Sequence, residues 1–469
     1  MSAVHPSGAQ RTVVILAAGL SPRHLNSHMP SVREFVQLQG GARTLRPSFP
    51  AVTCTSQADL LTGQPPRHHG VVANGWMDRQ AGEVRLWRQS NQLVRGPMVW
   101  ERARERFPGM TVANLFGWFN MCSSADFMVT PRPQYGADGR KVPDILTTPA
   151  SLRDRLQAEL GAFPLFHFWG PRADIRSSEW IAQATQRVMK WHDPALTITY
   201  VPHLDYMLQR EGPDGSHVPQ ELRELDRVLA TLLRACSDRG AKVILCSEYG
   251  VTAATQVVYP NRALQQAGLL ATRREFGGDA LDLQNSTAFA MCDHQISHVY
   301  TQHDRATAAA KEVLQSLPGV QRVLEQHELA SVELDHARSG DLVLVPKPGA
   351  WFAYPWWSHE SDAPDFAQTV DIHRKPGFDP CELLTDCTGS QAVMRVAMFR
   401  LRKVLGFRSM LRLTPLDATL VKGTHGLAET ESGLEPLLVA DGSLLPDHTH
   451  FPLRSVHDVI LRHLSGAHY

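Results

Sequence analysis

TVVILAAGL, at residues 12–20, is an unbroken apolar run that stops at a glycine and a leucine. Two later segments have the same form, LTITYVPHLDY (196–206) and AKVILCSEYG (241–250). Strands with both faces buried are apolar throughout, whereas half-exposed strands alternate between apolar and polar residues. The three segments therefore predict buried parallel strands with polar residues after their carboxyl ends. Ligands of such sheets bind just beyond those ends.

A helical pattern separates the second of these strands from the third. Apolar residues recur at every third or fourth position of PQELRELDRVLATLLRACSDRG (219–240), and Gly240 is a suitable residue to end the helix. Strands that alternate with helices predict an α/β fold, with a central, mainly parallel sheet flanked by helices. The chain has 469 residues, which is too long for one simple core, so we expect a second unit.

The pattern changes between about residues 260 and 415. A helix is predicted at 304–319, and a long ordered loop rich in Trp, Pro and charged residues at 355–380. We expect a smaller inserted α/β cap, so that residues 11–260 and 415–469 form the core and residues 261–414 form the cap and the long loop. The strands predicted for the cap are AFAMCDHQISHVYTQ (288–302), GVQRVLE (319–325) and GDLVLVPKPGAWFAY (340–354).

Composition narrows the class of protein. The 47 basic residues equal the 47 acidic ones, so bulk charge does not favour binding to nucleic acid or to a membrane surface. The seven cysteines are scattered and form no CxxC pair, which favours a reducing compartment. We find no signal-peptide pattern, and the longest apolar run, 13–20, is too short to span a membrane. We expect a cytoplasmic protein that contacts neither nucleic acid nor membrane.

FPAVTCTSQADLLTG (49–63) places hydroxyls on both sides of a thiol, directly before a run that is helical in pattern. One interpretation is a capped turn. The other is a nucleophile presented at the mouth of the sheet, either Thr53 or Cys54. A thiolate needs a cation or an imidazole beside it, and the sequence names no such partner, so Thr53 is the preferred candidate.

Segments along most of the chain resemble the alkaline phosphatase superfamily, in its branch of type I phosphodiesterases, nucleotide pyrophosphatases and phosphonoacetate hydrolases. The resemblance follows the order of the family's motifs, which includes the segment around a nucleophilic Thr, the segments that carry metal ligands and a late Gly-x-His-Gly segment. The segments that carry it are RTLRPSFPAVTCTSQADLLTGQPPRHHGVVANGWMD (43–78), HLDYMLQREGP (203–213), CSEYGV (246–251), ARSGDLVLV (337–345) and KGTHGLAETESGLEPLLVADG (422–442).

The resemblance implies two-metal hydrolysis at phosphorus. A Thr alkoxide attacks, a covalent intermediate forms and water releases it, while two ions activate the nucleophile and hold the oxygens. Carried over to this sequence, Thr53 is the nucleophile, and Asp205, Glu248 and His425 occupy positions of metal ligands. Glu248 is also a candidate for general acid or base catalysis.

The sequence departs from the family's pattern at several of the implied ligands. Ala18 stands where the first strand should end in Asp, and Gln209 stands where a His should follow Asp205. Tyr249 stands in place of a second His, and Ser56 in place of an Asn that would hold a phosphoryl oxygen. Too few ligands remain for two zinc ions. We expect one divalent ion, Zn or Mn, rather than two.

Other residues are candidates for completing the site. His203 lies two residues before Asp205, and in a strand the two would share a face, so His203 is a candidate metal ligand. Gln209 and Asn74, together with His373 and Arg374 of the long loop, are candidate substrate-binding residues. A lone histidine is more often a surface or core residue, and a charged run such as 372–377 is more often a solvated loop.

The sequence therefore predicts a hydrolase of phosphate esters, phosphodiesters or phosphonates that attacks with Thr53, and a small phosphorylated metabolite as its substrate. Two alternatives remain open. The first is a different, metal-independent reaction that uses Glu248, His203 or His425 as acid and base groups. The second is a catalytically inactive protein that binds a phosphorylated ligand.

Overall fold

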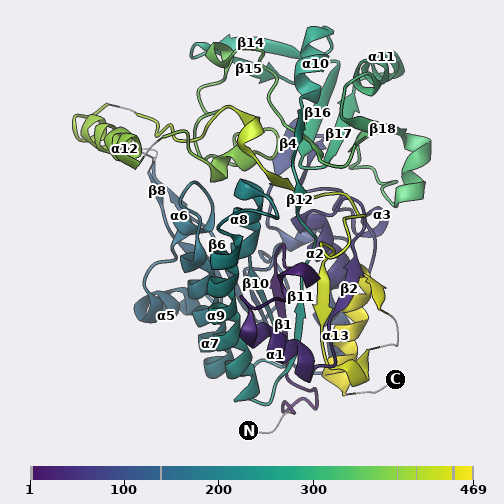
Figure 1. The fold of residues 1–469 in the computed structure, drawn as a ribbon, viewed down its shortest axis with the longest axis vertical. Helices are drawn as coiled ribbons and strands as arrows, with labels where there is room; N and C mark the ends of the chain where they lie inside the picture. Colours follow the sequence, from purple (N-terminus) through teal and green to yellow (C-terminus); the bar gives the residue numbers. More distant parts are fainter. Residues whose placement is uncertain (1–3, 138–139, 388, 408, 446–448, 467–469) are drawn as a thin grey trace.

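The computed structural model describes residues 4–137, 140–387, 389–407, 409–445 and 449–466. They form a larger part built on a nine-stranded sheet and a smaller part above it that contains a four-stranded sheet (Figure 1). The larger sheet takes its strands from both ends of the sequence, and the smaller sheet from the middle. The boundaries at 260 and 415 stay an interpretation of the sequence.

The larger sheet is mainly parallel. Its central strands β11, β1, β10, β5 and β6 are parallel neighbours, and β22 and β9 pair with them in the antiparallel sense. Every residue of β1 is buried, which accounts for its unbroken apolar sequence. The predicted α/β class is confirmed. In order across the sheet, the strands are β23 (His450–Pro452), β2 (Arg43–Arg46), β22 (Leu437–Val439), β11 (Lys242–Cys246), β1 (Thr12–Ala17), β10 (Leu196–Val201), β5 (Val112–Leu115), β6 (Phe127–Pro131) and β9 (Ile145–Thr148).

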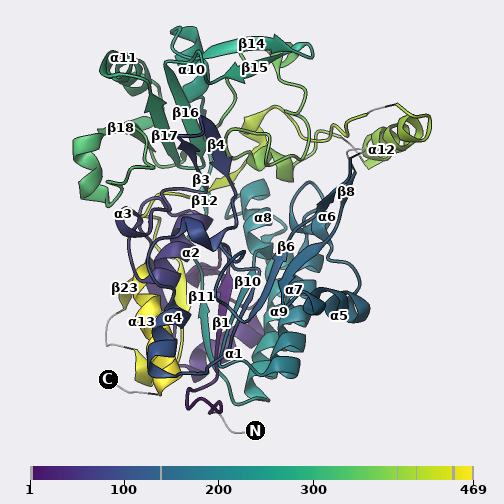
Figure 2. The ribbon, with the colours of Figure 1, turned by 180° about the vertical axis from the view of Figure 1, so that it is seen from behind.

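Helices flank this sheet in two groups, which the views of Figures 1 and 2 show from opposite sides. The helix predicted at 219–240 is confirmed as α9, which buries the apolar side of its pattern and ends at Ser237, three residues before Gly240. One group consists of α1 (Pro30–Leu38), α5 (Ser151–Leu160), α7 (Ile175–His192) and α9 (Val218–Ser237), and the other of α2 (Thr53–Thr62), α4 (Val99–Arg106) and α13 (Val456–Ser465).

The smaller sheet is antiparallel, in the order β16, β17, β19, β18. It packs against α10 and α11, and β16 also contacts β3 from the early part of the chain. The elements of this part are β3 (Gly75–Asp78), β4 (Glu83–Leu86), α10 (Pro260–Gln266), β14 (Ala271–Glu275), β15 (Gly278–Asp282), β16 (Ala288–Asp293), β17 (Ile296–Thr301), α11 (Asp304–Gln315), β18 (Val320–Glu325), β19 (Leu342–Pro346) and β20 (Ala350–Phe352).

Three strand predictions were wrong in extent. Residues 288–302 form a hairpin of two strands, with His294 in the left-handed conformation at its turn, φ +55°. Residues 340–354 also divide into two strands, β19 and β20. The segment 196–206 changes from strand to helix, because β10 ends at Val201 and α8 (His203–Glu211) begins after Pro202. A short apolar segment cannot be assigned to strand or helix by periodicity alone.

The long loop is ordered, as its aromatic residues predicted. Trp356 and Trp357 are buried, and their rings meet edge to face with centroids 5.2 Å apart. After the loop and the short 3-10 helix η5 (Pro380–Leu383), the chain forms α12 (Gly389–Val404), which the sequence analysis did not predict. Among the described residues, no helix is long and apolar enough to cross a membrane.

Gly250 marks a point of close backbone contact directly after Tyr249. A Cβ at this position would lie 1.6 Å from the carbonyl oxygen of Leu434, which is part of the backbone and cannot turn away. We expect Gly250→Ala to lower the free energy of unfolding by about 3 kcal/mol. Urea denaturation measures the change. Gly389→Ala is the matched control, because a Cβ there meets nothing within 4 Å. Equal stability of the two variants would contradict the close contact.

Candidate active site

Thr53 is the first residue of α2, at the carboxyl end of the large sheet. The first N–H groups of a helix have no partners within the helix, and together with the helix dipole they favour a bound anion. The Thr53 side chain is buried, and its Oγ1 lies 3.3 Å from the hydroxyl oxygen of Tyr249. Tyr249 follows β11 by three residues, so a strand end and a helix start bring the two hydroxyls together.

Tyr249 lies flat against His425. The ring centroids are 3.7 Å apart and the planes differ by 7°. His425 Nδ1 lies 2.8 Å from the carbonyl oxygen of Ala51, which can only accept, so this nitrogen carries the proton. Burial lowers the pKa of His425 to about 3. The imidazole is therefore neutral, with a fixed tautomer and a fixed orientation.

Asp205 projects from the first turn of α8 toward the same hydroxyl group. Burial raises its pKa to about 7, against the opposing effects of a hydrogen bond from Gln209 and of the Tyr249 hydroxyl. Gln209 Nε2 donates to Asp205 Oδ2 over 2.6 Å. Within the described residues, Asp205 Oδ1 and Gln209 Oε1 have no hydrogen-bond partner. These two buried oxygen atoms are therefore free to accept hydrogen bonds from a ligand or from water.

Glu248 is a second carboxyl group in this region, and it is fully buried. Neither of its carboxyl oxygens makes a hydrogen bond to a described residue. Burial, and then the charge of Asp205, raise the pKa of Glu248 well above its usual value, while the side-chain amide of Gln57 opposes the rise. The raised pKa favours the protonated form of Glu248, and a neutral carboxyl group can donate a proton.

The smaller part of the protein supplies the other wall of the site. His294, at the turn between β16 and β17, packs against His425 with ring centroids 3.9 Å apart, and against Phe378 of the long loop at 4.2 Å. Asp293 accepts hydrogen bonds from the backbone N–H of Asn74 (2.8 Å) and from its side-chain amide (3.0 Å). Asn74 Oδ1 accepts from the backbone N–H of Cys54. Asn74 thus ties the start of α2 to the smaller sheet.

The structure brings together most of the residues that the sequence analysis named. Thr53, Asp205, Gln209, Glu248 and His425 lie at one end of the large sheet, around Tyr249. Ser56 lies one turn into α2, buried, with its hydroxyl unpaired among the described residues. Tyr249 was noted in the sequence only as a substitution, and the hydrogen bond that it makes to Thr53 was missed.

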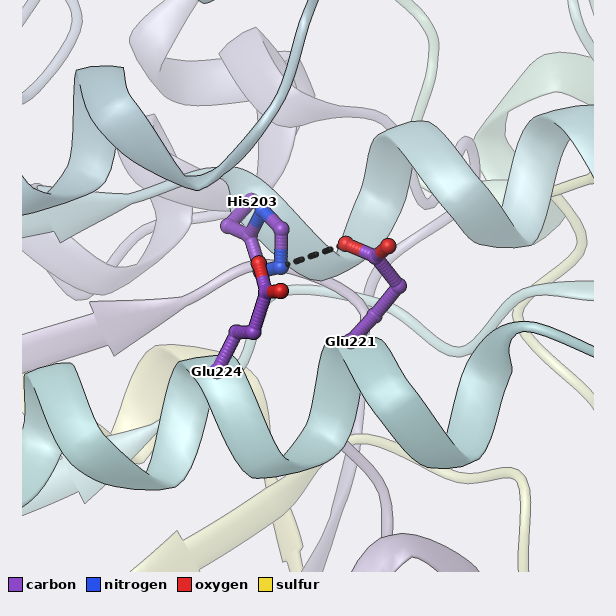
Figure 3. Close-up of side chains that lie close together, drawn as sticks. All are labelled: His203, Glu221 and Glu224. Carbon is purple, nitrogen blue, oxygen red and sulfur yellow. Dashed lines mark ion pairs between the residues drawn. The ribbon is translucent and has the colours of Figure 1, made fainter.

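His203 does not join this group. In a strand it would share a face with Asp205, but both residues lie in α8, where positions two apart project to nearly opposite sides. His203 faces α9 instead, with Nε2 2.9 Å from a carboxylate oxygen of Glu221 and with Glu224 beside it (Figure 3). Ligand atoms of these three residues lie within 4.8 Å of one another, and this is the one such group in the described part of the chain.

His373 and Arg374 also lie apart from this group. Both are exposed, in a turn of the long loop. Arg374 lies 3.7 Å from a carboxylate oxygen of Asp365. The adjacent Lys375 is buried instead, between carboxylates of Asp379 at 2.6 Å and Glu382 at 2.8 Å, so its charge is already neutralised.

The alternative nucleophile, Cys54, is disfavoured by its surroundings. The thiol is buried, and burial together with the charges of Asp293 and Glu248 raises its pKa well above the usual value. A neutral thiol is a poor nucleophile. Thr53 therefore remains the better candidate.

The residues present do not fit a pair of zinc ions beside Thr53. Zinc is held by several ionised or imidazole ligands, and Ala18, Gln209 and Tyr249 supply none at the positions where the family resemblance expects them. Burial raises the pKa of the Tyr249 phenol well above its usual value, which disfavours a phenolate ligand. The Gln209 amide is already hydrogen-bonded to Asp205.

Comparison with known proteins identifies the family. The family model for type I phosphodiesterase / nucleotide pyrophosphatase matches residues 12–379, so the chain belongs to this family of hydrolases, as the sequence motifs indicated. Members of the family typically depend on metal ions. An uncharacterised pyrophosphatase/phosphodiesterase of Schizosaccharomyces pombe is 20% identical over 255 residues, which cover 52% of this chain and 45% of that protein.

Solved structures share the whole fold at low sequence identity. Phosphonoacetate hydrolase from Sinorhizobium meliloti, in complex with phosphonoformate, is 14% identical, with a TM-score of 0.60 and coverage of 98% of both chains. Murine ectonucleotide pyrophosphatase / phosphodiesterase 5 is also 14% identical, with a TM-score of 0.56 and coverage of 97% of this chain and 95% of that one. The alkaline phosphatase-like fold predicted from the sequence is confirmed.

Two substitutions of Tyr249 separate its hydrogen bond from its ring contact. Tyr249→Phe keeps the ring against His425 but leaves the buried Thr53 hydroxyl without its partner, so we expect the free energy of unfolding to fall by about 1–2 kcal/mol. Tyr249→Ala also removes the ring and leaves a cavity, and the fall should reach about 3–5 kcal/mol. Urea denaturation measures both changes. Equal losses would mean that the ring contact contributes nothing.

Proposed function

We propose that this protein hydrolyses a phosphate ester, phosphodiester or phosphonate through a covalent intermediate on Thr53, without a metal ion at the reacting atoms. The observation that carries the proposal is the hydrogen bond between Thr53 and Tyr249 at the start of α2. At this point the Thr53 hydroxyl can act as the nucleophile, and Tyr249 and Asp205 can accept its proton. The N-terminus of α2 can bind the anionic phosphoryl group.

In the first step, Thr53 Oγ1 forms a bond to phosphorus and the bond from phosphorus to the leaving oxygen breaks. The Thr53 proton passes to the Tyr249 hydroxyl while the Tyr249 proton passes to Asp205. The protonated carboxyl of Glu248 gives its proton to the leaving oxygen. In the second step, water attacks phosphorus and the bond from phosphorus to Thr53 Oγ1 breaks. One proton of the water passes to Glu248, and the proton held by Asp205 returns through the Tyr249 hydroxyl to Thr53.

A small phosphorylated metabolite is the proposed substrate. The solved relatives of this fold bind small ligands of this kind, phosphonoformate in phosphonoacetate hydrolase and AMP in murine ectonucleotide pyrophosphatase / phosphodiesterase 5. The raised pKa of Glu248 agrees with an anionic substrate, because a protonated carboxyl group does not repel an anion.

Substitution of Thr53 tests the nucleophile. Thr53→Val keeps the shape of the side chain and removes the hydroxyl, so we expect turnover of an aryl phosphodiester or aryl phosphonate to fall at least about 1,000-fold. Thr53→Ser is the matched control, because it keeps a hydroxyl and should retain measurable turnover. Release of nitrophenol measures the rate, and mass spectrometry of quenched wild type detects a phosphorylated Thr53. Full activity of Thr53→Val would overturn the proposal.

The second candidate function is binding of a phosphorylated ligand without catalysis. The replacements at Ala18, Gln209 and Tyr249, together with the 6% exposure of Thr53, favour it. The same assay separates the two functions. Absence of wild-type turnover on phosphomonoesters, phosphodiesters and phosphonates, together with a rise of the melting temperature in AMP or phosphonoformate, would establish binding in place of hydrolysis.

We further propose that the divalent ion expected from the sequence, Zn or Mn, binds to His203, Glu221 and Glu224. An imidazole and two carboxylates are ligands that both ions accept. The His203 ring is 1% exposed, and neither ring nitrogen makes a well-aligned hydrogen bond to a described residue. An ion here lies on the α9 side of α8 and takes no part in the chemistry of Thr53.

Metal analysis tests this assignment. After dialysis against Zn or Mn, wild type should retain about one ion per chain, and His203→Gln should bind it at least about tenfold more weakly. His217→Gln is the matched control, because His217 is an exposed residue at the start of the same helix, α9, and pairs with Glu211. A chelator should remove the ion and leave turnover intact. Loss of turnover on chelation would contradict a metal-independent reaction.

A further inference from the structure

α12 extends sideways from the smaller part of the protein, away from both sheets (Figures 1 and 2). No residue of α12 is buried. A helix in water is normally stabilised by packing an apolar face against the rest of the protein. α12 therefore raises the question of what covers it.

Five large apolar residues of α12 form one continuous face that points to solvent, whereas Val396 and Phe399 lie on the other side of the helix and are partly buried. At 100° per residue, Val393, Met394, Met398, Leu401 and Val404 fall within an arc of about 140°. Their exposed fractions are 70%, 69%, 53%, 51% and 84%. Ala397 lies in the same arc, and Leu405, which follows the helix, continues it with 63% exposure. Large exposed apolar patches on proteins mark binding surfaces.

The borders of this face are cationic. Arg400 flanks it on one side, and Arg395 and Arg402 on the other, with Lys403 on the remaining surface. Arg395 pairs with Asp386, while Arg400, Arg402 and Lys403 form no ion pair with any described residue. Residues 389–416 contain no Asp or Glu. An exposed apolar face between rows of cations is typical of helices that lie in the interface of an anionic membrane.

A second copy of the chain is a poorer occupant of this face. Two such helices packed face to face would bring their bordering cations together, with no carboxylate between residues 389 and 416 to neutralise them. The helix is also too short to span a bilayer, at 16 residues. An anionic lipid surface is complementary both to the cations and to the apolar side chains of α12. Headgroup phosphates can pair with the cations, and the acyl chains can surround the apolar side chains.

We propose that α12 docks this protein onto a membrane surface rich in anionic phospholipid, with Val393, Leu401 and Val404 buried among the acyl chains. The zero net charge of the whole chain led to the opposite expectation, because bulk charge averages over surfaces that act separately. The proposal rests on α12 alone and is independent of the reaction at Thr53.

Sedimentation of the full chain with lipid vesicles tests the proposal. Wild type should pellet with vesicles of phosphatidylcholine and phosphatidylglycerol and remain in the supernatant with phosphatidylcholine alone, and high salt should release it. Leu401→Glu should abolish pelleting, and the double variant Arg400→Glu/Arg402→Glu should reduce it at least about tenfold. Leu38→Glu is the matched control, because Leu38 is an equally apolar residue on α1, 76% exposed, and should leave pelleting unchanged.

Two further measurements keep the test decisive. Because Leu401 is 51% exposed and no residue of α12 is fully buried, Leu401→Glu should leave the melting temperature unchanged, which separates loss of docking from loss of folding. Failure of wild type to pellet with anionic vesicles would overturn the proposal. So would a wild-type dimer in the absence of lipid that Leu401→Glu converts to a monomer, since a second copy would then cover the face. An acidic protein that competes with the vesicles for α12 and binds it more tightly would overturn it as well.

Discussion

The contact between Tyr249 and His425 determines the arrangement of the whole site. It places a residue that follows a central strand flat against a residue from the last fifth of the chain, at 3.7 Å. His294 then continues the stack into the smaller part of the protein. Stacked rings set both distance and tilt, so the contact fixes the position of the Tyr249 hydroxyl beside Thr53. The stacked rings of Tyr249, His425 and His294 therefore connect the two parts of the protein next to Thr53.

Burial disfavours the charged forms of the ionisable side chains around Tyr249. A site with two ions balances anionic ligands against bound cations. Here burial reduces the charge of the same residues, since it raises the pKa of Asp205 and Glu248 and lowers that of His425. Neutral groups are less costly to bury than ions, so the cluster around Tyr249 is compatible with a closed, apolar setting. One oxygen of Asp205 and both carboxyl oxygens of Glu248 have no hydrogen-bond partner among the described residues, so a substrate or water can bind to them.

The sequence predicted the sheet and the position of Thr53, because buried strands and their polar ends leave a local pattern. It did not predict the partners of His203, since Glu221 lies eighteen residues away and the contact depends on α8 being a helix. The importance of Tyr249 was hidden for a related reason. A motif shows which residue replaces a ligand, but only packing shows what the replacement contacts. α12 was not predicted, and the exposure of its apolar residues is a property of the packing that no sequence pattern shows.

The place of β22 in the large sheet has a consequence for how the chain reaches its folded state. This strand, residues 437–439, lies between β2 and β11, which are made much earlier in synthesis. Until residues 425–439 have left the ribosome, those two strands have no common neighbour and the ring of His425 is absent. When β22 inserts between β2 and β11, the sheet becomes continuous, and the same part of the chain brings His425 to the site. A nascent or truncated chain would carry Thr53 without the residues that position it, and would expose unpaired strand edges that chaperones and proteases recognise.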